Sequence, residues 1–435
     1  MKTFIRSLAL LSAFLCWSAA VPVLAQTQTA DQAKPIEQTP LVTDESIVLQ
    51  KVDVFHGAGI LVFQTPDGNF KWWLDGRINL DAAMYQSDLN TLANGVEIRR
   101  ARLALNMIFW QNWASQFDVE YISDGTIEIK DMWIGYTGVP NSILQIGNFK
   151  EPFGLETLTS SRYITFIERS LLDNFSPDRH IGVAFSKFDK RYYASGGLFG
   201  PAVGDTEATG QDQGYNVVGR VTALPLLTRN TLIHVGAAAS YMTPKAATAT
   251  DLSDADQMRL RARPETHVNR GRFIDTKKMS NIDHQNLIGF EAAAEFGPVS
   301  VQSEYNKATY KRTLSTLAEP SFDGWYAFVS WFPTGENRPY DWTAGEFDRV
   351  LPKSNRGALE LVARYSTANL NDPAAKILGG KEQITTIGAN WYANPNVRLM
   401  VDYAWVTNDE NTKGDRSYKV NDKFNTLQAR FQLMF

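Results

Sequence analysis

In the last twelve residues of the chain, Phe424 to Phe435, an apolar side chain occupies every second position from Leu427 onward. The apolar positions are Leu427, Ala429, Phe431, Leu433 and Phe435. A β-strand points successive side chains to opposite faces, so this segment has one apolar and one polar face. A terminal strand of this kind that ends on an aromatic residue is typical of a transmembrane β-barrel. Only a closed barrel leaves no unpaired strand edge in lipid.

The same alternation recurs from Phe70 onward in segments long enough to cross a bilayer as tilted strands of about 9 to 11 residues. We predict sixteen strands, at residues 70–85, 96–111, 113–123, 126–138, 142–149, 180–187, 191–199, 214–224, 231–241, 284–296, 299–311, 322–333, 357–368, 382–393, 396–408 and 423–435. A soluble sandwich can also alternate, but the regular recurrence and the even number favour a membrane barrel. The predicted fold is all-β, a transmembrane antiparallel β-barrel of about sixteen strands with inward-folded loops.

The predicted connections are short at one rim and long at the other, as in bacterial outer-membrane barrels. Residues 334–356 are the exception, because they form a long connection on the short side. We expect either an excursion into the periplasm or a miscounted pair of strands there.

The amino-terminus has the features of a secretory signal, with Lys2 and Arg6 before an apolar stretch that ends at Ala25. We predict a signal peptide at residues 1–25, a periplasmic leader at 26–69 and the barrel at 70–435. Export then delivers the chain to the outer membrane of a Gram-negative cell. The single cysteine, Cys16, falls in the signal peptide, so neither a disulfide nor a zinc site is expected in the mature chain. The net charge of −4 gives no reason to expect a nucleic-acid partner.

Arginines are concentrated in the predicted loop 242–283, which carries Arg259, Arg261, Arg263, Arg270 and Arg272. In an extended backbone, the spacing of two between the first three projects their guanidinium groups to one side, about 6 to 7 Å apart. Arginine stays charged and offers a planar fork of donors to oxyanions. A row of such sites suits the passage of anions. A solvated external loop, or one that binds lipopolysaccharide phosphates, has the same composition.

A second basic group lies on the predicted strands. By parity Arg77, Arg100 and Arg102 face the lumen, and Arg99 lies at the strand mouth. The inward-facing acids Asp75, Asp81, Asp118 and Glu120 could pair with them. Loop 150–179 adds the hydroxyl and guanidinium donors Ser160, Ser161, Arg162 and Arg169.

Neither a nucleophile with a base nor a cluster of metal ligands is present in the sequence, and the histidines are scattered. We therefore expect no enzymatic activity, no metal and no cofactor.

The chain resembles the phosphate-selective porins O and P from about Phe70 to Phe435. The resemblance rests on Ile98-Arg99-Arg100-Ala101, Gly154-Leu155-Glu156, Thr159-Ser160-Ser161, Glu168-Arg169, Arg259-x-Arg261-x-Arg263 and Asn390-Trp391-Tyr392-Ala393-Asn394. It implies a homotrimer of sixteen-stranded barrels in outer-membrane lipid, with an arginine ladder that leads anions to a central site. Carried over to this chain, the ladder is Arg259, Arg261 and Arg263, and the central site is Arg77, Arg99, Arg100, Ser160, Ser161 and Arg169.

Four positions depart from the pattern of the phosphate-specific members. Thr157 stands where a lysine is expected and Lys130 where an aspartate is expected, and Asp341 and Glu346 replace lysines. These departures favour general anion selectivity over strict phosphate selectivity. The expected function is passive diffusion of small inorganic anions, with phosphate and polyphosphate among the candidates. A barrel that acts as a ligand receptor or adhesin is the alternative.

Overall fold

The structure is a computed structural model that describes residues 53–57, 60–121, 125–204, 213–228, 230–245 and 256–435. The predicted signal peptide and most of the predicted leader lie outside these residues. The described part forms one sheet of eighteen strands, of which all but β1 and β2 make an antiparallel barrel of sixteen. Within these residues, no helix is long and apolar enough to span a membrane.

The barrel strands coincide with the sixteen predicted segments to within a few residues. The first eight are β3 (Phe70–Ser87), β4 (Gly95–Phe109), β5 (Trp113–Tyr121), β6 (Ile127–Tyr136), β7 (Ser142–Lys150), β8 (Arg179–Asp189), β9 (Tyr192–Phe199) and β10 (Asn216–Leu227). The other eight are β11 (Thr231–Met242), β14 (Ile282–Phe296), β15 (Val299–Arg312), β16 (Ser321–Trp331), β19 (Ala358–Asp372), β20 (Ile377–Tyr392), β21 (Val397–Asn408) and β22 (Lys423–Met434). The predicted fold class is confirmed.

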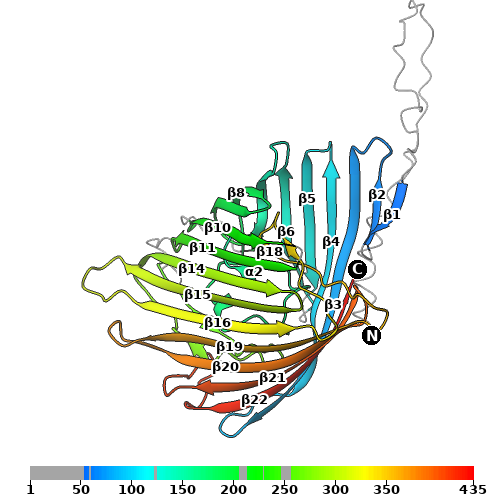
Figure 1. Cartoon of the computed structure of the whole chain (residues 1–435). Helices are drawn as coiled ribbons and strands as arrows, with labels where there is room; N and C mark the ends of the chain where they lie inside the picture. Colours follow the sequence, from blue (N-terminus) through cyan, green and yellow to red (C-terminus); the bar gives the residue numbers. More distant parts are fainter. Residues whose placement is uncertain (1–52, 58–59, 122–124, 205–212, 229, 246–255) are drawn as a thin grey trace, which may run out of the picture. The chain divides into compact units, whose positions relative to one another are not determined.

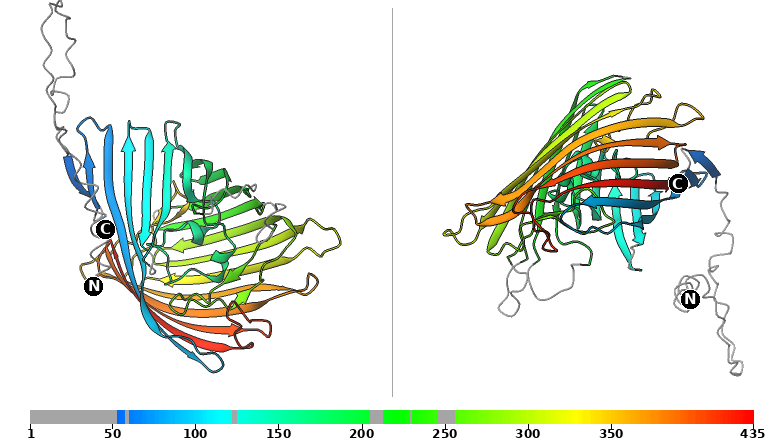
Figure 2. Two further views of the ribbon diagram at one scale, coloured as in Figure 1. Left: turned by 180° about the vertical axis from the view of Figure 1, so that it is seen from behind. Right: turned by 90° about the horizontal axis from the view of Figure 1, so that it is seen from below.

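Strand β22 closes the barrel by pairing with β3, from Met434 opposite Arg77 to Phe424 opposite Ser87. Figure 2 shows these two strands, red and blue, side by side. The last residue, Phe435, exchanges two backbone hydrogen bonds with Gly76, of 2.8 and 3.1 Å. Along β22, Phe431 is 40% exposed on the outer face, whereas Arg430 is only 1% exposed on the inner face. The predicted alternation is therefore confirmed.

A β-hairpin precedes the barrel, formed by β1 (Asp53–Gly57) and β2 (Ile60–Gln64). Strand β2 pairs with residues 71–73 of β3, on the edge that also receives β22 but beyond the end of β22. The ring of Phe63 stacks on Trp72 with centroids 4.2 Å apart. The alternation pattern did not predict this hairpin within the range 26–69. It covers backbone groups of β3 that would otherwise be unpaired.

The connection 332–357 between β16 and β19 lies at the rim of the short turns. It contains the two-residue strands β17 (Tyr340–Asp341) and β18 (Glu346–Phe347), which pair with each other. Phe347 is buried against Leu155 and inward-facing residues of the wall. The count of sixteen strands removes the alternative of a miscounted pair, and the connection folds back into the lumen.

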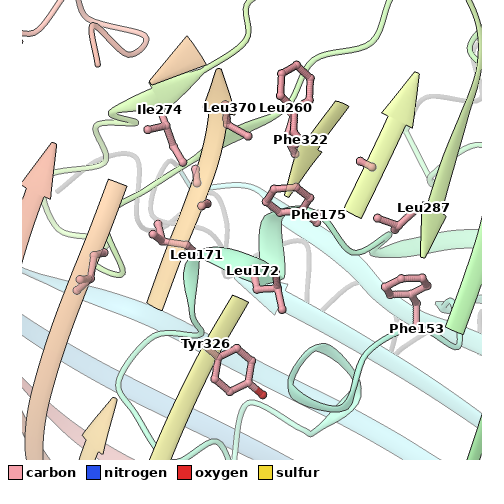
Figure 3. Packing of buried hydrophobic residues seen from close by; sticks show 14 of the residues in the cluster. Phe153, Leu171, Leu172, Phe175, Leu260, Ile274, Leu287, Phe322, Tyr326 and Leu370 are labelled. Carbon is pink, nitrogen blue, oxygen red and sulfur yellow. The ribbon is translucent and has the colours of Figure 1, made fainter. Parts of the chain in front are cut away.

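Loop 151–178 folds into the barrel and carries α2 (Leu155–Leu158) and the 3-10 helix η2 (Leu171–Asn174). The carboxylate of Glu304 on β15 accepts hydrogen bonds from the backbone N–H groups of Leu155 and Glu156, which fixes the start of α2. Apolar packing holds the rest of this loop, as Figure 3 shows. Phe153, Leu171, Leu172 and Phe175 meet Leu287, Phe322, Tyr326 and Leu370 of the wall, together with Leu260 and Ile274.

Leu260 and Ile274 belong to the second inward segment, residues 256–281, where β12 (Arg261–Ala262) and β13 (Ile274–Asp275) form a short ladder. Both inward segments thus pack through apolar side chains against the wall formed by β14 to β19. The polar part of the lumen lies beside the opposite wall, which is formed by β3 to β8.

Candidate functional site

A β-bulge in β4 brings two consecutive arginines into the lumen. Asn79 is paired with Arg100 and Leu80 with Ile98, so Arg99 is the extra residue. Ile98 and Leu103 remain exposed on the outer face, as the alternation requires. Parity alone did not predict that Arg99 faces the lumen, because parity does not reveal a bulge.

A second bulge, on β6, has the same effect for Lys130 and Asp131. Phe117 is paired with Met132 and Val119 with Ile129, which leaves one extra residue between them. The ammonium group of Lys130 lies 3.2 Å from the Glu120 carboxylate, and Asp131 accepts two hydrogen bonds from Arg179, of 2.8 and 3.1 Å. An aspartate therefore does face the lumen, one position beyond Lys130.

Glu168, on the inward loop, joins the loop to the arginines of the wall. Its carboxylate receives hydrogen bonds from Arg99 and from Arg430, each at 2.8 Å, and lies 3.7 Å from Arg100. Burial by itself would raise the pKa of Glu168, but Arg99, Arg100 and Arg430 hold that pKa well below its usual value. Glu168 is consequently charged at any physiological pH, and it fixes the loop against β4 and β22.

The inward loop and the wall enclose a cavity of about 450 Å³, which we call the inner cavity. The predicted site residues that line it are Arg77, Arg100, Arg102, Ser160, Ser161, Arg162 and Arg169. Arg77 donates only a long hydrogen bond, of 3.4 Å, to the hydroxyl of Ser160. Nε of Arg77 and Nη1 of Arg100 are buried and have no hydrogen-bond partner in the described part of the chain. Both guanidinium groups line the inner cavity, and neither is hydrogen-bonded to a carboxylate within the described residues.

Other cations of the inner cavity already have partners. Arg102 binds Glu120 through two hydrogen bonds, of 2.8 and 3.2 Å, and Arg162 binds Asp75. Arg169 donates to the carbonyl oxygens of Glu156 and Thr159, at 2.8 Å each. The cavity is therefore graded, with Arg77 and Arg100 less neutralised than Arg102 and Arg162.

A second cavity of about 630 Å³, the outer cavity, adjoins the first. It is lined by Arg99, Arg263, Arg270 and Arg272, and it shares Arg100, Arg102, Arg169 and Arg179 with the inner cavity. Burial and the neighbouring Arg272 and Arg99 lower the pKa of Arg263 to about 10, which leaves Arg263 charged at neutral pH. The four shared arginines border both cavities, and we call the two cavities together the passage.

The predicted row of Arg259, Arg261 and Arg263 is divided in this structure. Arg259 forms an ion pair with Asp275, and neither Arg259 nor Arg261 lines the two cavities. Arg263 does, together with Arg270 and Arg272. The spacing of two grouped the first three, but Arg259, which lies just before β12, is bound to Asp275 of β13.

Two cations of the passage, Lys150 and Arg179, were missed. They are paired with each other at the ends of β7 and β8. The parity of Ile146 on β7 and of Val183 on β8 assigns both of them to the outer face, yet both line the inner cavity. The ammonium group of Lys150 donates to the carbonyl oxygens of Thr157 and Leu158. A lysine therefore does approach Thr157, from β7.

A closed barrel with an apolar outer surface and a cation-lined passage beside an inward loop defines an outer-membrane porin. The model of the family described as phosphate-selective porin O and P matches residues 73–435, and the chain belongs to this family. The resemblance inferred from the sequence motifs is thus confirmed, and so is the outer-membrane location.

Individual relatives agree with this assignment. Porin O of Pseudomonas aeruginosa is 27% identical over 397 residues, which cover 82% of this chain and 88% of that protein. An uncharacterized protein of Caulobacter vibrioides is 29% identical over 400 residues, which cover 86% of this chain and 75% of that protein. Among solved structures, the anion-selective porin from Comamonas acidovorans shares the fold with a TM-score of 0.52 at 12% identity, covering 84% of this chain and all of that one. The family and the fold indicate a channel, which favours the porin over the receptor or adhesin.

Proposed function

We propose that each barrel of a homotrimer conducts small inorganic oxyanions, phosphate among them, from the outer cavity to the inner cavity. The observation that carries this proposal is the set of four arginines common to both cavities, Arg100, Arg102, Arg169 and Arg179. An anion that moves between the cavities exchanges one guanidinium group for the next without passing through an uncharged gap.

The chemistry of these groups suits the passage of an anion better than its tight binding at one site. Guanidinium groups form charge-assisted hydrogen bonds to oxyanions, and several sites of similar strength let an ion move on, whereas one tight site would trap it. Asp118, Asp131 and Glu120 offset part of the positive charge, which keeps the sites moderate.

Two side chains near the inner cavity bear on the preference of the channel for phosphate over chloride. Lys150 approaches Thr157, and Asp131 faces the inner cavity, so two of the four departures have a substitute close by. Asp341 and Glu346 remain acidic. We expect phosphate to compete with chloride for the passage, with only modest discrimination.

The proposal is tested in planar bilayers with the purified full-length mature protein across a tenfold KCl gradient. The reversal potential should have the sign of chloride preference, and inorganic phosphate should reduce the chloride current. Arg100→Ala should weaken both effects. Arg356→Ala is the matched control, because Arg356 is exposed on the connection 332–357 and lines neither cavity. A wild-type reversal potential that shows cation preference would refute the proposal.

The trimer is tested separately, by the mass of the unheated protein in mild detergent. We expect a mass of three chains that falls to one on heating. A single chain under both conditions would contradict the homotrimer and leave the pathway within each barrel untouched.

A further inference from the structure

The inner cavity contains an acid that differs from the other acids of the passage. Asp131 is paired with Arg179 at 2.8 Å, and Asp118 lies 3.7 Å from Arg102. Glu346 also lines this cavity, but its carboxylate makes neither an ion pair nor a hydrogen bond within the described ranges of the chain. When the Glu346 carboxylate is charged, no single cation in the described residues neutralises it.

The position of Glu346 follows from the connection 332–357. Gly345, with φ of +68°, occupies the left-handed region, and its carbonyl oxygen accepts a 2.8 Å hydrogen bond from the fully buried Arg220 of β10. Arg220 is itself held by Glu291 at 2.8 Å. These contacts fix the backbone of β18 against the wall, and the next side chain, Glu346, projects into the inner cavity.

We propose that Glu346 is a specificity-determining residue of the channel, a carboxylate fixed at the inner cavity that opposes the binding of phosphate, and of dianions most strongly. This inference rests on the proposed function and deepens it. A negative charge beside a bound anion raises the free energy of that anion in proportion to the anion's charge, so it penalises a dianion twice as much as a monoanion.

The groups around Glu346 determine when it is charged. Burial raises its pKa to about 8, against the opposing effects of Lys150 on β7 and Arg220 on β10. Asp341 on β17 and the neighbouring Asp348 raise it further. Beyond Lys150, Arg169 and Arg179 lie in the same cavity, and α2, which packs against β18, carries Glu156, whose carboxylate is bonded to Ser170. Glu346 is thus mostly neutral at pH 6 and charged at pH 9, so its opposition to phosphate grows as the pH rises through about 8.

The experiment compares the wild type with Glu346→Gln by the phosphate concentration that halves the chloride current, at pH 6 and pH 9. We divide the half-blocking phosphate concentration of the wild type by that of the variant. This ratio corrects for the protonation of phosphate at each pH, because both proteins are exposed to the same ion. We expect a ratio near one at pH 6 and of roughly three- to tenfold at pH 9, as for one unit charge several ångströms away in a partly hydrated cavity.

Asp189→Asn is the matched control. Asp189 is an exposed acid at the end of β8 and lines neither cavity. Its ratio should stay within about twofold at both pH values, because water and salt screen an exposed charge outside the passage. A ratio for Glu346→Gln that is near one at pH 9, or equal at both pH values, would overturn the inference while leaving the proposed function intact. Cation preference in the wild type would instead refute the proposed function, and this inference with it.

Discussion

Replacement of Arg77 is the most direct test of the graded cavity. Arg77 is 4% exposed, makes no ion pair in the described part of the chain, and keeps Nε without a hydrogen-bond partner. Because its guanidinium group lines the inner cavity, an anion in that cavity would gain a charge-assisted hydrogen bond from Arg77. Loss of such a bond costs about 1.5 to 3 kcal/mol, which corresponds to roughly ten- to hundredfold in affinity.

In Arg77→Ala, the phosphate concentration that halves the chloride current should rise by about ten- to hundredfold. The barrel should fold normally, because no carboxylate loses its partner, and the shift of the unheated protein on gels should be unchanged. Arg77→Lys keeps the charge but not the fork, so it should lose less. A half-blocking concentration in Arg77→Ala within about twofold of the wild type would refute the reasoning, because that change is well below the loss of one charge-assisted bond.

Further predictions concern the outer cavity and the closure of the barrel. Arg263→Ala should reduce the chloride preference at low salt, whereas Arg259→Ala should leave the reversal potential unchanged, because only Arg263 lines the outer cavity. Gly76→Ala should lower the yield of folded barrel on gels, since its new Cβ would lie 2.6 Å from the ring of Phe435. Deletion of Phe435 should also lower this yield and cause the chain to accumulate in the periplasm. A normal yield of folded barrel in either variant would contradict the prediction for that variant. Arg430→Met should destabilise the barrel by about 3 to 5 kcal/mol in urea unfolding, because the buried carboxylate of Asp81 loses the arginine that bonds it, while Glu168 keeps Arg99. An unchanged urea midpoint would show that this network does not hold the inward loop.

The barrel could be predicted because its signal is local. Each strand repeats its apolar side chain at every second residue, and lipid on one side enforces the pattern over its whole length. Trp72 and Leu74 on β3 are exposed, as the alternation requires, and the predicted inward-facing Asp75 and Arg77 are buried.

The site was harder to predict because it depends on departures from that repeat. Arg99 faces inward only through a bulge, and Lys150 and Arg179 reach the cavity at strand ends, where parity assigns them outward. The hairpin before the barrel was missed since its two strands have five residues each, too few for a periodic signal. Loop composition identified the cationic segments but not their folded path, which left Arg259 and Arg263 grouped although their surroundings differ.

The bulge at Arg99 also changes how the chain tolerates a change of length. Loss of one residue from the middle of a regular strand transfers all the following side chains to the wrong face, so apolar groups enter the water and charges enter the lipid. Loss of Arg99 instead restores the regular pairing of Ile98 and Arg100 with Leu80 and Asn79. Related barrels can therefore gain or lose an arginine at this point without disturbing the face that meets the lipid. Each such insertion or deletion changes the charge of the passage by one unit, while the membrane-facing side chains stay in register.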